Sequence, residues 1–219
     1  MREPQKFWNR LAPRYARMPV RDQDAYREKL RRTRMHLGPQ ASVLEAGCGT
    51  GSTALALADA AGHVLATDFS GKMIAIAEKK RREAGAANVE FRTAWWDELS
   101  GSYDAVLAMN VFHVLPHAEP AVGHLASLVK PGGVLVSSTT CVADNSVFAR
   151  RLAPVFAAVG VFPQISIFSR AQYEAMLARA GLEIIDSWHP RRLAAWFDVA
   201  RKPLPPGQPA DQPAPDQPA

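Results

Sequence analysis

The chain has 219 residues, of which 47% are hydrophobic, and a formal net charge of +5. This length suits one α/β domain with a sizeable core, and no apolar run approaches the roughly 18 residues of a membrane span. Its two cysteines exclude a disulfide framework, and the charged N-terminus lacks the apolar core of a secretory signal, so we expect a cytoplasmic protein.

Basic residues concentrate at the start of the chain. Residues 1–36 hold eleven lysines and arginines against four acidic residues, a net charge of +7. A solvated helix face is the simplest interpretation. The alternative is attraction to an anionic substrate or to lipid headgroups, which would give a weak contact with a membrane surface. Basic stretches interleaved with aromatic residues are lacking, so no nucleic acid is expected as a partner.

The same arm predicts two amphipathic helices. Pro19 breaks the first helix, Asp22 is a candidate N-cap of the second, and Gly38-Pro39 ends it. Apolar stripes of this kind usually pack in the core, and we interpret Phe7 and Trp8 in that way. The first stripe, at helical spacing, consists of Phe7, Trp8, Leu11 and Tyr15.

Residues 43–51, Val-Leu-Glu-Ala-Gly-Cys-Gly-Thr-Gly, predict an apolar strand followed by a glycine-rich turn that opens a helix. Such a turn brings bare backbone against a ligand. The dinucleotide fingerprint would need a glycine at Ser52, and Glu45 would repel a pyrophosphate. A carboxylate there suits an ammonium or a sulfonium instead. The turn predicts a cationic nucleoside such as S-adenosylmethionine (SAM), with binding residues Glu45, Gly47, Gly49 and Gly51.

The next strand ends in a second carboxylate. Residues 63–68 read as this strand, and Asp68 lies 17 positions beyond Gly51. A carboxylate about 20 residues after the glycines binds ribose hydroxyls in nucleotide-binding βαβ units. The alternative is an N-cap for the following helix, but Ser70 is an equally good cap. We therefore predict the ribose role for Asp68.

From residue 41 to 139 the chain alternates short apolar runs with helical stretches, which indicates a parallel sheet covered by helices on both faces. A further helix is expected over 170–181, and a final strand pair over 182–185 and 194–200. Between residues 41 and 139, strands are expected at 42–46, 63–67, 88–92, 103–109 and 133–139, and helices at 51–61, 71–84 and 117–129.

Four motifs, in order and spacing, resemble the class I SAM-dependent methyltransferases, most closely the small-molecule and lipid methylases of the ubiquinone and menaquinone kind. They are Glu45–Gly51, Asp68-Phe69-Ser70, Tyr103–Asn110 and Leu128–Leu135. The resemblance implies a Rossmann-like, doubly wound, seven-stranded α/β sheet, mostly parallel with an antiparallel C-terminal edge. It also implies a helical lid at 1–39 and a SAM-binding domain at 40–202. Residues 203–219 hold seven prolines in 17 residues, and this composition predicts a disordered tail.

The resemblance also implies further site residues. Tyr15 matches the family's lid tyrosine, and Phe69 follows the acidic strand end. The family's aspartate that binds the adenine amino group aligns with Trp95, which cannot accept a hydrogen bond. Either Asp97 takes over that contact or adenine is held by stacking and backbone donors, and we expect one of Trp95 and Trp96 to reach the pocket.

Asn110 follows the fourth strand, where the transferred methyl group should lie. His113 is the ionisable side chain near this line. It could act as a general base for a hydroxyl acceptor or be a neutral wall residue. The missing Asn-Pro-Pro-Tyr motif argues against methylation of nucleobases. The segment 141–168 favours either an apolar acceptor or plain core packing, through Phe148, Leu152, Val155, Phe156, Phe162, Ile165 and Phe168.

We therefore expect methyl transfer from SAM to a small-molecule or lipid-like acceptor by in-line displacement. Alignment of the reactants supplies most of the catalysis, and the sequence shows no zinc-ligand spacing, so no metal is expected. One alternative is a non-catalytic SAM-fold binding protein at a membrane surface. A nicotinamide oxidoreductase is disfavoured by Glu45 and Ser52. The acceptor, its accepting atom and the oligomeric state stay open.

Overall fold

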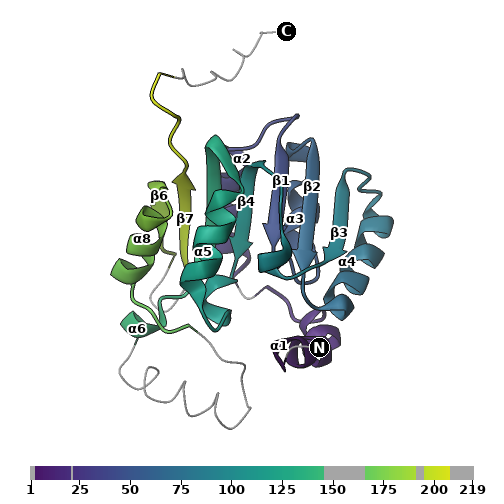
Figure 1. The fold of residues 1–219 in the computed structure, drawn as a ribbon. Helices are drawn as coiled ribbons and strands as arrows, with labels where there is room; N and C mark the ends of the chain where they lie inside the picture. Colours follow the sequence, from purple (N-terminus) through teal and green to yellow (C-terminus); the bar gives the residue numbers. More distant parts are fainter. Residues whose placement is uncertain (1–2, 21, 146–165, 191–194, 208–219) are drawn as a thin grey trace.

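A seven-stranded sheet forms the centre of the computed structural model, which describes residues 3–20, 22–145, 166–190 and 195–207 (Figure 1). The strand order is β3-β2-β1-β4-β5-β7-β6. The strands are β1 (Ser42–Ala46), β2 (His63–Asp68), β3 (Val89–Thr93), β4 (Tyr103–Met109), β5 (Val129–Thr139), β6 (Glu183–Trp188) and β7 (Trp196–Arg201).

The sheet reverses its direction of growth between β1 and β4. Strand β1 pairs in parallel with both β2 and β4, and β4 pairs in parallel with β5. Strand β7 is antiparallel to its neighbours β5 and β6. This arrangement confirms the predicted doubly wound sheet with an antiparallel C-terminal edge. In such sheets, ligands bind beyond the carboxyl ends of the strands at the switch point.

Helices cover both faces of the sheet. Figure 1 shows α5 and α8 on the near face, with α2 and α3 behind the sheet. One core cluster joins the strands to α5 and α8, and the other joins them to α3 and α4. The α-helices are α1 (Glu3–Tyr15), α2 (Gln23–Arg34), α3 (Ser52–Leu57), α4 (Gly71–Ala84), α5 (Ala118–Ser127), α6 (Val142–Asn145) and α8 (Arg170–Arg179), and the short 3-10 helices are η1 (Ala58–Ala60), η2 (Trp96–Glu98) and η3 (Phe112–Val114).

The predicted helix caps are present. The Asp22 carboxylate accepts a hydrogen bond from the Ala25 backbone N–H at 3.0 Å, and the Ser70 hydroxyl accepts one from Met73 at 3.2 Å. Strand β5 begins at Val129, earlier than predicted, because Val129 already pairs with Tyr103 before the ladder shifts register and resumes at Ala105. The sequence predicts this strand only over residues 133–139.

Most of the basic side chains of α2 have partners inside the fold. Arg32 forms ion pairs with Glu28 and, at 2.6 Å, with Asp186 of β6. Arg31 also pairs with Glu28, and Arg34 pairs with Asp59. The pairs with Glu28 lie within α2, whereas those with Asp186 and Asp59 tie the helix to the rest of the domain. Much of the positive charge on this helix is therefore neutralised locally.

Some sequence predictions lie outside the described residues. They include the apolar positions of the 141–168 segment up to residue 165, and the tail from residue 208. Phe168, at the end of that segment, is buried. Over the parts of the chain that the structure describes, no helix has the length and apolar character needed to cross a bilayer.

Candidate active site

A cavity of about 700 Å³, partly open to solvent, lies at the carboxyl ends of β1, β2 and β4. It occupies the switch point where the fold predicts a ligand. The lining residues are Trp8, Tyr15, Ala46, Gly47, Gly49, Thr67, Asp68, Phe69, Met73, Ala94, Trp96, Met109, Asn110, Val111, Val114 and Leu115.

The glycine-rich loop after β1 brings backbone to the cavity wall. Gly47 has a φ of +71°, and a Cβ there would lie 2.5 Å from a methyl group of Val111, so only glycine fits. Gly49 also lines the cavity. Gly51 does not, because it faces the Phe91 ring of β3 and Ala77 of α4, and a Cβ there would collide with both. Gly51 therefore allows close packing of helix α3, and its predicted contact with a ligand has no support in this geometry.

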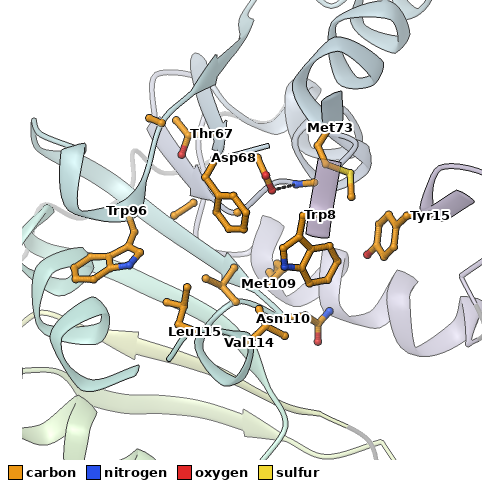
Figure 2. A pocket seen from close by; sticks show the side chains of 16 residues that line it. Trp8, Tyr15, Thr67, Asp68, Met73, Trp96, Met109, Asn110, Val114 and Leu115 are labelled. Carbon is orange, nitrogen blue, oxygen red and sulfur yellow. Dashed lines mark hydrogen bonds between the residues drawn. The ribbon is translucent and has the colours of Figure 1, made fainter. Parts of the chain in front are cut away.

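Asp68 ends β2 and points into the cavity (Figure 2). One carboxylate oxygen accepts a hydrogen bond from the Gly49 N–H at 3.0 Å, and the other accepts one from the Ser70 N–H at 2.8 Å. Ser70 itself caps α4, so the alternative of Asp68 as the cap is not needed. Burial raises the pKa of Asp68. The two backbone bonds fix the carboxylate while leaving lone pairs for a ligand's hydroxyl groups.

Glu45 lies behind the cavity wall and does not line it. Its Oε2 atom is buried and has no hydrogen-bond partner among the described residues. Burial raises the pKa of Glu45 to about 8, a hydrogen bond from the Ala54 backbone opposes this rise, and the nearby Asp68 carboxylate adds to it. Two acidic groups at one end of a mainly apolar cavity would be stabilised by a cationic ligand.

The Trp95-Trp96 pair divides between two environments. Trp96 lines the cavity, whereas Trp95 stacks on Phe69 with ring centroids 4.4 Å apart and an interplanar angle of 11°. The expectation that one of the two indoles reaches the pocket therefore holds for Trp96. Trp95 supports Phe69, which is itself a lining residue. Asp97 is not among the lining residues.

Helix α1 closes one side of the cavity. Figure 2 shows Trp8 and Tyr15 on the side opposite Trp96. Gln5 donates to the Phe69 carbonyl at 2.7 Å, and the Ser70 hydroxyl donates to Asn9 at the same distance, so the helix is held against the loop after β2. Trp8, which the sequence suggested as a core residue, is thus a cavity residue. Tyr15 lines the cavity as predicted and keeps 44% of its surface exposed.

Asn110 follows β4 and lines the cavity with its backbone in the left-handed region, at a φ of +61°. The Ser138 hydroxyl donates to Asn110 Oδ1 at 3.3 Å, and the Asn110 N–H donates to the Ser138 carbonyl at 2.8 Å. These bonds hold the side chain at the junction of β4 and β5.

His113 lies in η3 and lines none of the described cavities. Its Nδ1 accepts a hydrogen bond from the Thr140 N–H at 3.3 Å. Burial and the charge of Lys29 lower the pKa of His113 to about 4. This environment argues against a general base, and because His113 lines neither cavity, the geometry does not support the alternative of a neutral wall residue either. Among the described residues, no group of three or more His, Cys, Asp or Glu side chains could hold a metal ion.

Fold and cavity together define a Rossmann-like domain with a mainly apolar site at its switch point. Residues 18–187 match the protein family described as the methyltransferase domain, and the chain belongs to this family.

Relatives with a described activity agree with this family. The chain is 33% identical over 153 residues to a malonyl-[acyl-carrier protein] O-methyltransferase of Paenibacillus sp., a match covering 65% of this chain and 55% of the relative. It is 31% identical over 167 residues to a ubiquinone biosynthesis O-methyltransferase of Xanthomonas campestris, covering 74% of this chain and 62% of the relative. The chain thus spans little more than half the length of these relatives.

A solved structure supports the fold. The magnesium protoporphyrin IX methyltransferase of Synechocystis, determined with bound SAM, superposes with a TM-score of 0.69 at 21% identity. The match covers 92% of this chain and 98% of that one.

Proposed function

We propose that this chain is a SAM-dependent methyltransferase acting on a small-molecule or lipid-like acceptor. One observation carries the proposal. A mainly apolar cavity at the switch point of a methyltransferase-family fold is flanked by the fixed carboxylate of Asp68 and by Glu45, whose buried Oε2 lacks a partner. An uncompensated acidic group at this place fits a cationic nucleoside and opposes a pyrophosphate.

The residues present fit SAM. Asp68 would accept hydrogen bonds from the ribose hydroxyls, the backbone of Gly47 and Gly49 would lie against the ligand, and the Trp96 and Phe69 rings would contact the adenine. When bound, SAM supplies a methyl group on a sulfonium. The positive charge of the ligand would favour loss of the proton that buried Glu45 otherwise keeps at neutral pH.

The work of the protein would then be alignment and exclusion of water. Trp8 and Tyr15 of α1 cover the cavity, and we propose residues 1–39 as a helical lid on the 40–202 domain. Holding two reactants in line can lower a barrier by up to about 7–11 kcal/mol in ideal cases. No side chain has to form a covalent intermediate.

The accepting atom of the substrate is best taken as oxygen. The two relatives are both described as O-methyltransferases, one for a carrier-bound malonyl group and one in ubiquinone biosynthesis. These substrates are those of the two relatives. For this chain they support the coarser class of a small or lipid-like acceptor with an oxygen nucleophile.

Calorimetric titration with S-adenosylhomocysteine (SAH), the demethylated product, tests the proposal. The wild type should bind SAH, and Asp68→Asn should weaken the affinity by about tenfold or more, because one ribose-facing acceptor is lost. Asp59→Asn is the matched control, since the Asp59 carboxylate is exposed and pairs with Arg34 outside the cavity. A folded wild type with no affinity for SAH or SAM would overturn the assignment. Release of SAH from SAM in the presence of a cell extract would then measure turnover.

A further inference from the structure

A second cavity adjoins the first beneath helix α2. It encloses about 710 Å³ of space, part of it open to solvent. Tyr26 and Lys29 of α2 line it, together with Thr53 of α3 and with Met109, Asn110 and Ser138 at the ends of β4 and β5.

The two cavities share a wall. Met109 and Asn110 line both of them. A group bound in the second cavity would therefore meet a ligand of the first cavity beside the Asn110 side chain. This is the relation that a methyl acceptor needs to a methyl donor.

Lys29 is the cation of the second cavity. Its ammonium donates to the Ser138 hydroxyl at 2.7 Å, and that hydroxyl donates in turn to Asn110 Oδ1 at 3.3 Å. The side chain is partly buried, and within the described parts of the chain it forms no ion pair. Asp22, which also lines the cavity, acts on Lys29 only as a nearby charge.

This situation differs from that of the other α2 cations. Arg31, Arg32 and Arg34 each form an ion pair at 2.8 Å or less. Lys29 instead loses hydration at a cavity wall, which lowers its pKa, with only a neutral hydroxyl as its hydrogen-bond partner. A partly buried ammonium of this kind gains most from an anionic oxygen that enters the cavity.

The expected ligand of the first cavity gives a second reason to expect an anion in the second cavity. Under the proposed function, its ligand carries a positive charge on the far side of the shared wall. Two facing cations repel each other, and an anion between them removes the repulsion. The cavity also has apolar lining in Val20, Met109 and Pro190, which suits the carbon skeleton of the same molecule.

We propose that the second cavity binds the methyl acceptor and that Lys29 selects acceptors carrying an anionic oxygen, a carboxylate or a phenolate. The identification of the bound molecule as a methyl acceptor rests on the proposed function. Ser138 is a positioning residue, because it holds the ammonium beside Asn110. The accepted molecules are therefore small organic acids with an apolar part.

The test compares carboxylates with their neutral amides. Full-length protein is titrated by ligand-detected NMR, once saturated with SAH and once without it. The ligands are two carboxylates, benzoate and hexanoate, and their neutral amides, benzamide and hexanamide. The wild type should bind a carboxylate at least about tenfold more tightly than its amide. Lys29→Met should remove this preference while leaving SAH affinity within about twofold. Lys29→Arg keeps the charge and should retain much of the preference.

Lys79→Met controls for the loss of one positive charge, since Lys79 is exposed on α4 and pairs only weakly, at 3.8 Å, with Glu83. Thermal melting of each variant establishes that it folds. Equal binding of carboxylates and amides by the wild type, or an unchanged preference in a folded Lys29→Met, would overturn the inference while SAH binding stands. Loss of SAH binding in the wild type would instead overturn the proposed function.

Discussion

Replacement of Glu45 by glutamine should remove the contribution of this carboxyl to the pH dependence of stability. The folded protein raises the pKa of this carboxyl from 4.5 to about 8, mainly by burial. The unfolded chain releases the proton near pH 4.5 and the folded chain keeps it, so rising pH favours unfolding across that interval. The raised pKa thus costs stability between about pH 5 and pH 8.

The magnitude follows from the same numbers. Each pH unit is equivalent to about 1.4 kcal/mol, so the full interval corresponds to at most about 5 kcal/mol. Between pH 5 and pH 7 the wild type should lose about 2 kcal/mol relative to Glu45→Gln. The amide imitates the protonated acid and does not titrate. For a chain of this size the difference corresponds to roughly 4–8 °C in melting temperature.

Urea unfolding of both proteins at pH 5, 6, 7 and 8, without ligand, measures this difference. Only the change with pH is compared, because the amide places an additional donor in the core whose cost is independent of pH. Calorimetry of SAM binding at pH 7 in two buffers of different ionisation enthalpy adds a second readout. The wild type should release a proton as Glu45 ionises beside the cation, and the variant should not. Parallel stability curves for the two proteins would refute the reasoning.

Three further outcomes are expected. His113→Gln should leave the pH profile of kcat/KM unchanged between pH 6 and pH 8, because the pKa of His113 is already about 4. If the wild-type pH profile of kcat/KM instead rises near neutral pH and this rise is absent in the variant, His113 acts as a general base. Trp8→Ala should weaken SAH binding by about tenfold through lost contact area, whereas Met35→Ala, at a side chain 58% exposed outside the cavity, should not. Turnover should survive EDTA, since no chemistry here requires a metal. Complete loss of turnover that Mg²⁺ restores would contradict this expectation.

The sheet and the core of the site could be predicted from sequence because their determinants are local. The glycine turn follows β1 directly, and Asp68 ends β2 at the spacing expected for a nucleotide fold. The carboxyl ends of these neighbouring parallel strands meet at one edge, as their pairing shows. Order along the chain was therefore enough to place Gly47, Gly49 and Asp68 around one cavity.

The remaining site residues depend on contacts that local sequence does not encode. Trp8 belongs to an apolar stripe, and the same stripe can face a core or a ligand cavity depending on where α1 docks. Trp95 and Trp96 are neighbours, and the short η2 helix decides which indole turns inward. Gly51 shares its motif with Gly47, yet the approach of Phe91 from β3 and Ala77 from α4 gives it a packing role. Lys29 gave no sequence signal, because its cavity forms only when α2 docks beside the ends of β4 and β5.

The backbone of Asn110 constrains how this protein can change over evolutionary time. Among the described residues it is the one non-glycine side chain in a left-handed conformation, which costs most residue types about 1–2 kcal/mol. Glycine would relieve this cost but would remove the amide that the two adjoining cavities share. A variant with glycine here would give up control over how its two ligands face each other, so selection for the reaction should keep the asparagine.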